Sequence, residues 1–353
     1  MPTTNTLADE QPRRDYPSDP EGRGAVPATP VRLLSGSDVR ALLEAAPLVD
    51  LMEQGLAAFS AGDVVNPLRT VLYAGSPSAY VGLMPAFLPA DGALGAKLVT
   101  AFASNKDRGL PSHFATIVLL DAATGLLRAI VDGRYITEMR TAAVSAVAVR
   151  HLGRASAKVL AVLGAGVQAR GHLDMLDALH AFEEIRVWSP VTARERFRPE
   201  SLQSRAPFVV SASAEAAVRG ADVVLLVTDS PEPVVQSSWV GPGTLIVSVG
   251  ACRPDHREID PALLTRSRLI VDSRVSALQE SGDVIKGLAD QLFDGGHIRG
   301  ELGDVILGRV SARTSPDDVV VFKSLGLGME DVAAAALVCR LAEERGVGQR
   351  VCL

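Results

Sequence analysis

The stretch Lys158-Val159-Leu160-Ala161-Val162-Leu163-Gly164-Ala165-Gly166-Val167-Gln168-Ala169 leads from an apolar run through a glycine-rich turn into an amphipathic segment. The apolar run has the length of a buried strand, and residues 167–181 have the spacing of a helix. The first glycine permits a tight turn, the second lets a phosphate approach the backbone, and the helix N-terminus offers N–H donors to an anion. In this context the pattern favours a dinucleotide site over a structural turn, with Gly164, Gly166, Val167 and Gln168 as cofactor-binding residues.

The region after Gly153 alternates short apolar runs with helical segments. Helices are predicted at 167–181 and 213–219, and strands at 158–163, 185–188, 221–227, 244–249 and 267–271. Buried strands separated by helices are typical of a parallel, doubly wound sheet. We therefore expect a Rossmann-type dinucleotide-binding domain over residues 154–317.

The region before Gly153 has closely spaced β-rich runs separated by turns, which favour an antiparallel or mixed sheet. These runs are 68–73, 80–84, 94–102, 113–121 and 127–132. An Ala-rich helix is predicted to start at Thr137 and to continue to about His151. Beyond residue 310, a strand at 319–322 and a long helix at 329–345 are expected. The fold class is therefore α/β, with a Rossmann-type doubly wound parallel sheet and a second, α+β domain.

Length and composition exclude several classes of protein. The chain has 353 residues, 47% of them hydrophobic, which suits two domains with aliphatic cores. Its net charge of −6 disfavours a nucleic-acid or anionic membrane partner, since these require a concentrated basic face. No apolar run is long enough to span a membrane. Residues 1–30, with six prolines and eight charged residues, are predicted to be a disordered tail.

Cysteine and histidine usage points to a reducing, cytoplasmic setting without a metal. The three cysteines, Cys252, Cys339 and Cys352, form no paired motif that would indicate a disulfide framework. The six histidines show no metal-ligand spacing.

The end of the second strand of the predicted Rossmann domain bears on cofactor choice. An NAD site usually has an acid there to bind the ribose 2′-hydroxyl, but the strand at 185–188 is followed by Ser189, Thr192 and Arg194. Hydroxyls and an Arg suit a 2′-phosphate, so NADP(H) is the preferred cofactor and NAD(H) a possible one. The alternative is that Ser189 and Thr192 only cap the next helix.

Several motifs together resemble one known family. They are Gly82-Leu83-Met84-Pro85, Leu94-Gly95-Ala96-Lys97, Thr137-Glu138-Met139-Arg140-Thr141-Ala142-Ala143, Glu301-Leu302-Gly303-Asp304, and Phe322-Lys323-Ser324-Leu325-Gly326 followed by Glu330-Asp331. In this order, over residues 31 to 350, they resemble the ornithine cyclodeaminase/mu-crystallin family. The resemblance implies an NAD(P)-dependent enzyme that acts on small α-imino or α-amino acids. It also implies a homodimer and a discontinuous substrate-binding and dimerisation domain made of residues 31–153 and 318–353.

Three cationic residues are the candidates for substrate binding. Lys97 lies in an apolar strand, Arg140 interrupts an Ala/Val helix near its predicted first turn, and Arg69 lies on a strand. From the sequence alone each could be a surface side chain with a buried stem. The resemblance implies that all three hold the substrate carboxylate, with Lys97 also serving as an acid. Because three like charges repel, we expect an anion to occupy the cluster.

Other candidate residues lie on the cofactor side. The resemblance implies that Thr141, Thr228 and Lys323 lie near the cofactor. Asp229 is a candidate base, although it stands one residue earlier than the Asp of ornithine cyclodeaminases and could be an ordinary turn residue. Those enzymes also carry a Glu that meets the substrate amine, where this chain has Gly82.

The absence of that carboxylate favours one of three possible functions. The leading hypothesis is an NAD(P)H-dependent reductase or dehydrogenase, similar to a ketimine reductase, that transfers hydride to an imine carbon next to a carboxylate. The alternative is an ornithine or lysine cyclodeaminase that releases ammonia. A second alternative is a non-catalytic protein that binds a small ligand on the same scaffold.

Overall fold

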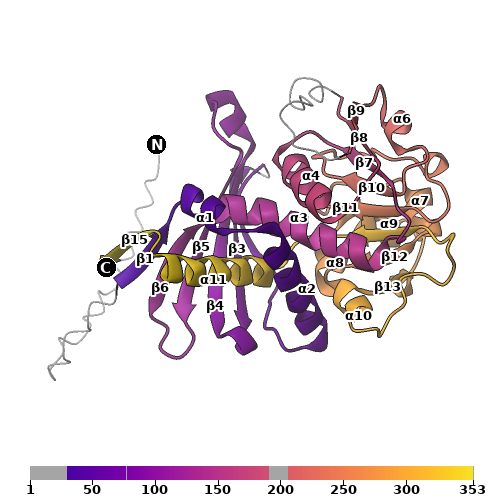
Figure 1. The fold of residues 1–353 in the computed structure, drawn as a ribbon. Coiled ribbons are helices and arrows are strands. Elements are labelled where there is room, and N and C mark those ends of the chain that lie inside the picture. The colour runs from indigo at the N-terminus through magenta and orange to yellow at the C-terminus, as the bar shows by residue number, and fades with distance from the viewer. Residues whose placement is uncertain (1–29, 77, 191–205, 353) are drawn as a thin grey trace, which may run out of the picture.

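The computed structural model describes residues 30–76, 78–190 and 206–352. Within them, two β-sheets lie side by side, and the long helix α3 (Gly133–Leu152) extends from one to the other (Figure 1). None of the helices in these ranges is long and apolar enough to cross a membrane.

The eight-stranded sheet has the order β13-β12-β14-β11-β10-β7-β8-β9, and all its strands are parallel. The strands are β7 (Val159–Leu163), β8 (Glu184–Trp188), β9 (Phe208–Val210), β10 (Val223–Leu226), β11 (Leu245–Ser248), β12 (Arg268–Val271), β13 (Ile298–Glu301) and β14 (Val320–Lys323). The central strands are fully buried, as their continuous apolar runs require. The predicted doubly wound parallel sheet is confirmed, and its strand order reverses between β7 and β10.

Short helices connect these strands: α4 (Val167–Leu179), α6 (Ala214–Val218), α7 (Pro261–Arg266), α8 (Arg274–Glu280), α9 (Gly282–Ala289) and α10 (Leu302–Ile306). The pattern of the sequence predicts α4 and α6 but none of the last four. Each of those four has at most eight residues, which is too short for a clear helical period.

The last strand of this sheet, β14, corrects the expected domain boundary. Residues from 318 onward were expected in the substrate-binding domain, but Val320–Lys323 lies in the eight-stranded sheet between β11 and β12. The strand is fully buried and pairs in parallel with both neighbours. The chain therefore leaves this sheet only after Lys323.

The seven-stranded sheet has the order β15-β1-β6-β5-β4-β3-β2, antiparallel except for the pairing of β1 with β6. Its strands are β1 (Pro30–Leu34), β2 (Thr70–Ser76), β3 (Ala79–Leu88), β4 (Ala93–Phe102), β5 (His113–Asp121), β6 (Leu127–Asp132) and β15 (Gln349–Cys352). This is the mixed sheet that the closely spaced β-rich runs predict.

One face of the seven-stranded sheet is covered by helices. The helices α1 (Gly36–Leu42), α3 and α11 (Gly328–Arg345) lie across this face (Figure 1). Adjacent strands align Met84, Lys97 and Ile117 in one row, and all three side chains are buried. The next row includes Leu83 and Leu98, which are exposed on the opposite face. The register thus places the ammonium of Lys97 under α11.

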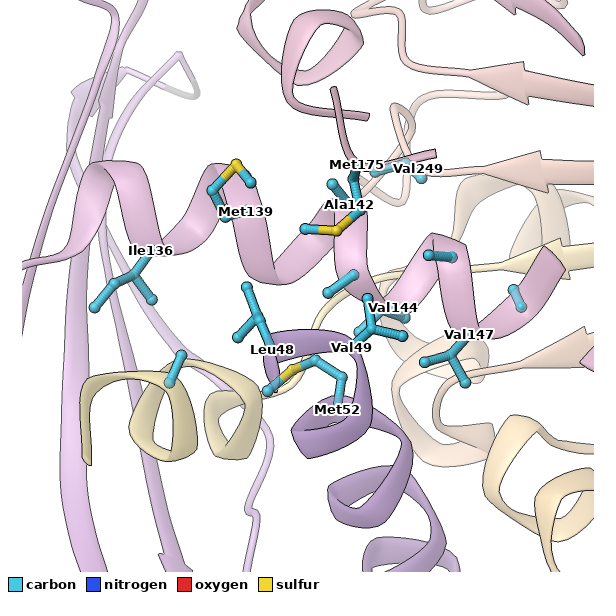
Figure 2. Packing of buried hydrophobic residues seen from close by; sticks show 14 of the residues in the cluster. Leu48, Val49, Met52, Ile136, Met139, Ala142, Val144, Val147, Met175 and Val249 are labelled. Atoms are coloured by element: carbon cyan, nitrogen blue, oxygen red, sulfur yellow. The ribbon is translucent and has the colours of Figure 1, made fainter. Parts of the chain in front are cut away.

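Helix α3 is the element that both halves of the molecule share. Val144 and Val147 lie beside Val49 of helix α2 (Ala45–Ala61), while Ala142 lies near Met175 of α4 (Figure 2). Helices that pack on several sides of α3 leave it buried along most of its length, which explains its small side chains.

The start of α3 differs from the sequence-based expectation. The helix begins at Gly133, capped by Asp132, and not at Thr137, because Gly133 fits against β5 where a Cβ atom would lie 2.9 Å from that of Ala115. Arg140 therefore lies in the second turn of α3, and its side chain reaches α11.

Candidate active site

The glycine-rich turn after β7 has the geometry of a phosphate-binding loop. Gly164 has φ +123°, and a Cβ atom there would lie 2.6 Å from the carbonyl oxygen of Val227. Gly166 precedes α4 without a side-chain cap, and a Cβ atom built on it meets nothing within 4 Å. The space beside Gly166, at the N-terminus of α4, is therefore open at the point where the strand order reverses, as a pyrophosphate requires.

The residues of this turn thus fit a dinucleotide. Gly166, Val167 and Gln168 would hold the pyrophosphate, and the Val167 side chain is exposed there. The side-chain oxygen of Gln168 is buried without a hydrogen-bond partner; as an acceptor it suits a hydroxyl of a dinucleotide and not a phosphate oxygen.

The ribose end of the predicted cofactor site is described only in part. Strand β8 ends at Trp188, and Arg186 on this strand pairs with Glu184 at 2.9 Å. Ser189 follows directly, but Thr192 and Arg194 lie outside the described residues. The preference for NADP(H) therefore stays a prediction from the sequence.

Lys97 forms a buried ion pair with α11. Its Nζ atom lies 2.6 Å from Oδ2 of Asp331 and 3.4 Å from the hydroxyl of Thr137. Burial lowers the pKa of Lys97 to about 8, against the attraction of Asp331, and the positive charge of Arg140 lowers it further. An ammonium group with this pKa can release a proton near neutral pH.

Arg140 binds the same carboxylate. Its Nε donates to Oδ1 of Asp331 at 3.1 Å, and its Nη1 donates to Glu330. Burial alone would lower the pKa of Arg140, but the two carboxylates outweigh it and keep the guanidinium charged. Burial raises the pKa of Glu330 to about 7, although Arg140 opposes the shift. Asp331 therefore joins two cations that lie far apart in the sequence.

Arg69 reaches the same segment from the other side. It directly precedes β2, and its Nη2 donates to the carbonyl oxygens of Leu325 at 2.7 Å and Gly326 at 2.9 Å. Its Nε lies 3.1 Å from Glu280. The structure thus brings the three predicted cations to the loop after β14 and to the first turn of α11.

The expectation of an unbalanced cationic cluster is wrong in one respect. Asp331, Glu330 and Glu280 partly neutralise the three cations, so no bound anion is needed to hold them together. In the sequence, Glu330 and Asp331 stand only as part of a motif. Two adjacent acids in the first turn of an apolar helix were the signal that could have identified them as partners of Lys97 and Arg140.

The cluster still has capacity for a small anion. Nη2 of Arg140 has no hydrogen-bond partner among the described residues, and the Lys97 ammonium has a third N–H. A planar guanidinium beside an ammonium can hold a carboxylate and place a proton next to it.

The other predicted site residues have different surroundings. Asp229 is exposed after β10, and no ion pair joins it to the described cations. The hydroxyl of Thr228 donates to Glu258 at 2.8 Å, and that of Thr141 donates to the carbonyl of Thr137 within α3 at 2.6 Å. Lys323 is buried, so its ammonium group faces the protein interior.

The family model that matches the chain is that of the ornithine cyclodeaminase/mu-crystallin family, over residues 31–346. Ketimine reductase mu-crystallin of Rattus norvegicus is 40% identical over 86% of this chain and 95% of its own length. Δ1-pyrroline-2-carboxylate reductase of Bacillus cereus is 31% identical over 90% of this chain and 99% of its own.

A solved structure agrees with these relatives. The Δ1-pyrroline-2-carboxylate reductase of Thermococcus litoralis, in complex with NADH and L-proline, superposes with a TM-score of 0.86 and 34% identity. The similarity covers 91% of this chain and 100% of that one. The glycine turn, the cations gathered beside α11 and these similarities agree, and this chain belongs to the ornithine cyclodeaminase/mu-crystallin family.

Proposed function

We propose that this protein reduces the C=N bond of a small cyclic α-imino acid, of the kind that pyrroline-2-carboxylate represents. The observation that carries the proposal is the pair of buried cations, Lys97 and Arg140, that share Asp331. Relatives named ketimine reductase and pyrroline-2-carboxylate reductase support the same chemistry. The enzyme class is an oxidoreductase that acts on C–N bonds.

Each cation has a distinct part in this proposal. Arg140 and Arg69 bind the substrate carboxylate and thereby fix the position of the adjacent imine carbon. Bound NAD(P)H supplies the hydride that this carbon accepts. Lys97 donates a proton from Nζ to the imine nitrogen, which becomes an amine, and recovers a proton from water. Asp331 keeps Lys97 in place and stabilises its charged form.

The position of Gly82 supports reduction over cyclodeamination. Gly82 is buried on β3, and a Cβ atom there would lie 3.0 Å from Cγ1 of Val99 on β4. This position, two rows from Lys97 on the same face of the sheet, therefore offers no carboxylate to bind a substrate amine.

We propose NADP(H) as the preferred cofactor, with NAD(H) as a second possibility. The support is that no acid stands directly at the end of β8, whereas Ser189, Thr192 and Arg194 supply hydroxyls and a positive charge. The Thermococcus litoralis relative is solved with NADH, so both cofactors belong in the test.

We also propose a homodimer formed through the face of the seven-stranded sheet that lies away from α11. Leu72 is 69% exposed on this face, and Leu83, Leu98 and Phe114 are about 40% exposed there. A row of exposed apolar side chains on adjacent strands is typical of an interface, and its occupant is a second copy of this chain. The three free cysteines fit a reducing, cytoplasmic setting.

Replacing Arg140 with Lys tests the carboxylate site. The variant keeps the charge but loses the planar fork, so kcat/KM for Δ1-pyrroline-2-carboxylate should fall about tenfold or more, while NADPH affinity stays within about twofold. Arg150→Lys, the same change at a more exposed position on α3, should leave both values unchanged. An Arg140→Lys loss below about threefold contradicts the assignment. Conversion of ornithine to proline and ammonia without net cofactor turnover would indicate a cyclodeaminase.

The pH profile tests the role of Lys97. The ammonium must be protonated to donate, so kcat/KM should fall as pH rises through about 8, the pKa of Lys97. The side chain in Lys97→Arg stays protonated throughout this range. The variant should therefore be less active, and its kcat/KM should not fall as pH rises through about 8. Titrating the free imine by absorbance separates its ionisation from that of the enzyme. A wild-type profile that is flat through this range would exclude Lys97 as the proton donor.

Fluorescence titration with NADPH and NADH tests the cofactor preference. An Arg–phosphate contact is a charge-assisted hydrogen bond, so NADPH should bind about tenfold more tightly, and Arg194→Ala should remove most of the difference. Equal affinities, or tighter binding of NADH, would refute the proposal.

Light scattering after size-exclusion chromatography tests the homodimer. Leu98→Asp places a charge in the middle of the apolar face and should convert the dimer into a monomer. Leu307→Asp, a similarly exposed leucine after α10, is the matched control and should not change the mass. A monomeric wild-type protein, or a dimeric Leu98→Asp variant, contradicts this interface.

A further inference from the structure

The carboxylate of Glu258 accepts five hydrogen bonds from two loops. Oε1 accepts from the backbone N–H of Thr228 at 3.0 Å and from its hydroxyl at 2.8 Å. Oε2 accepts from the Ser248 hydroxyl at 3.0 Å and from the N–H groups of Gly250 at 3.0 Å and Ala251 at 3.3 Å. Glu258 is fully buried, so all its hydrogen-bonding capacity serves the segments that follow β10 and β11.

A second set of buried groups holds Glu258 itself. Oδ1 of Asp283 accepts from the N–H groups of Glu258 at 2.9 Å and Ile259 at 3.0 Å. Its Oδ2 lies 3.3 Å from Nζ of Lys323, which donates to the hydroxyl of Ser248 at 3.0 Å. Since Ser248 also bonds to Glu258, the contacts form a closed ring that ties the ends of β11 and β14 to α9.

The two loops that Glu258 joins are in close contact. A Cβ atom on Gly250 would lie 2.0 Å from the carbonyl oxygen of Thr228 and 2.4 Å from Oε1 of Glu258. Only a glycine fits at this position, and the loops cannot shift toward each other. The carboxylate keeps the two loops together, because without it five buried donors would lack a hydrogen-bond acceptor.

These loops lie on one side of the predicted cofactor site. The pyrophosphate is expected at the N-terminus of α4, where the strand order reverses between β7 and β10. The adenosine half of a dinucleotide then extends over β8, and the nicotinamide half extends over the carboxyl ends of β10 and β11. The closed set of hydrogen bonds around Glu258 therefore supports only the nicotinamide half of the cofactor.

We infer that Glu258 is a positioning residue for the nicotinamide ring: it fixes the loops after β10 and β11 in the arrangement against which the ring binds. The inference rests on the proposed function, since it requires a nicotinamide cofactor. It assigns a role to Lys323 as well. This lysine, expected near the cofactor, contacts Ser248 and Asp283 on the far side of the loops. In this role it supports the loops and does not contact the nicotinamide.

Two ligands separate this role from a general structural one. NAD(P)H carries both halves of the cofactor, whereas ADP-ribose, or its 2′-phosphate if NADPH binds better, lacks the nicotinamide. In Glu258→Gln the amide keeps the shape of the side chain, but its NH2 group cannot accept the loop N–H groups. Affinity for NAD(P)H, from fluorescence titration, should fall about tenfold or more, and affinity for the ADP-ribose ligand, from calorimetry, should change less than about twofold.

Control variants make the result specific. Glu301→Gln removes a carboxylate that accepts from Ser60 and Arg274, away from these loops, and should leave both affinities unchanged. Ser248→Ala removes one of the five donors and should shift NAD(P)H affinity in the same direction by a smaller factor, which keeps the test available if Glu258→Gln does not fold.

Each remaining outcome is informative. Equal losses for both ligands in Glu258→Gln and Ser248→Ala, or no loss for either, would overturn the positioning role. Failure of the wild-type protein to bind either ligand would instead refute the cofactor assignment on which the proposed function depends.

Discussion

The structure depends on one carboxylate, that of Asp331, which lies between the ammonium of Lys97 and the guanidinium of Arg140. The contacts of 2.6 Å and 3.1 Å join a strand, the central helix and the C-terminal helix, which are distant in the sequence. All three groups are buried, and a buried charge that loses its partner is strongly destabilising. The residues proposed to bind substrate therefore also hold α3 and α11 against the seven-stranded sheet.

The free donors around Asp331 suit an anionic substrate. Burial raises the pKa of Glu330, although Arg140 opposes the shift, so the carboxylate that faces Arg140 binds a proton more readily than an exposed glutamate does. Arg69 adds a further positive charge, and only Glu280 pairs with it among the described residues. Arg140 and Lys97 nonetheless keep N–H donors free in surroundings of low polarity, where an added carboxylate is strongly attracted. The acidic residues stabilise the cations when no ligand is bound, and they leave room for a substrate carboxylate.

Sequence reasoning identified the parallel sheet, the glycine turn and the buried lysine, because these depend on local patterns: apolar runs, glycine spacing and a charge within a strand. It could not identify the partners of Lys97 and Arg140, since ion pairs across 190 or more residues, as between Arg140 and Asp331, are set by tertiary packing. It also placed the start of α3 one turn late, because contact with β5, and not helix propensity, decides where Gly133 begins the helix. Glu258 gave no local signal, since its donors come from separate loops.

The position of β14 has a consequence for how the chain folds. This strand fills the gap between β11 and β12, so the pair β12 and β13 cannot join the other five strands of the sheet until residue 323 has been synthesised. The seven-stranded sheet is also incomplete until the C-terminal elements have been synthesised, because β15 pairs with β1 and α11 covers β3 and β4. Pairings between such distant segments fold slowly and expose apolar strand edges in the meantime. A ribosome that stalls before this point would present two unfinished sheets, which are candidates for chaperone binding.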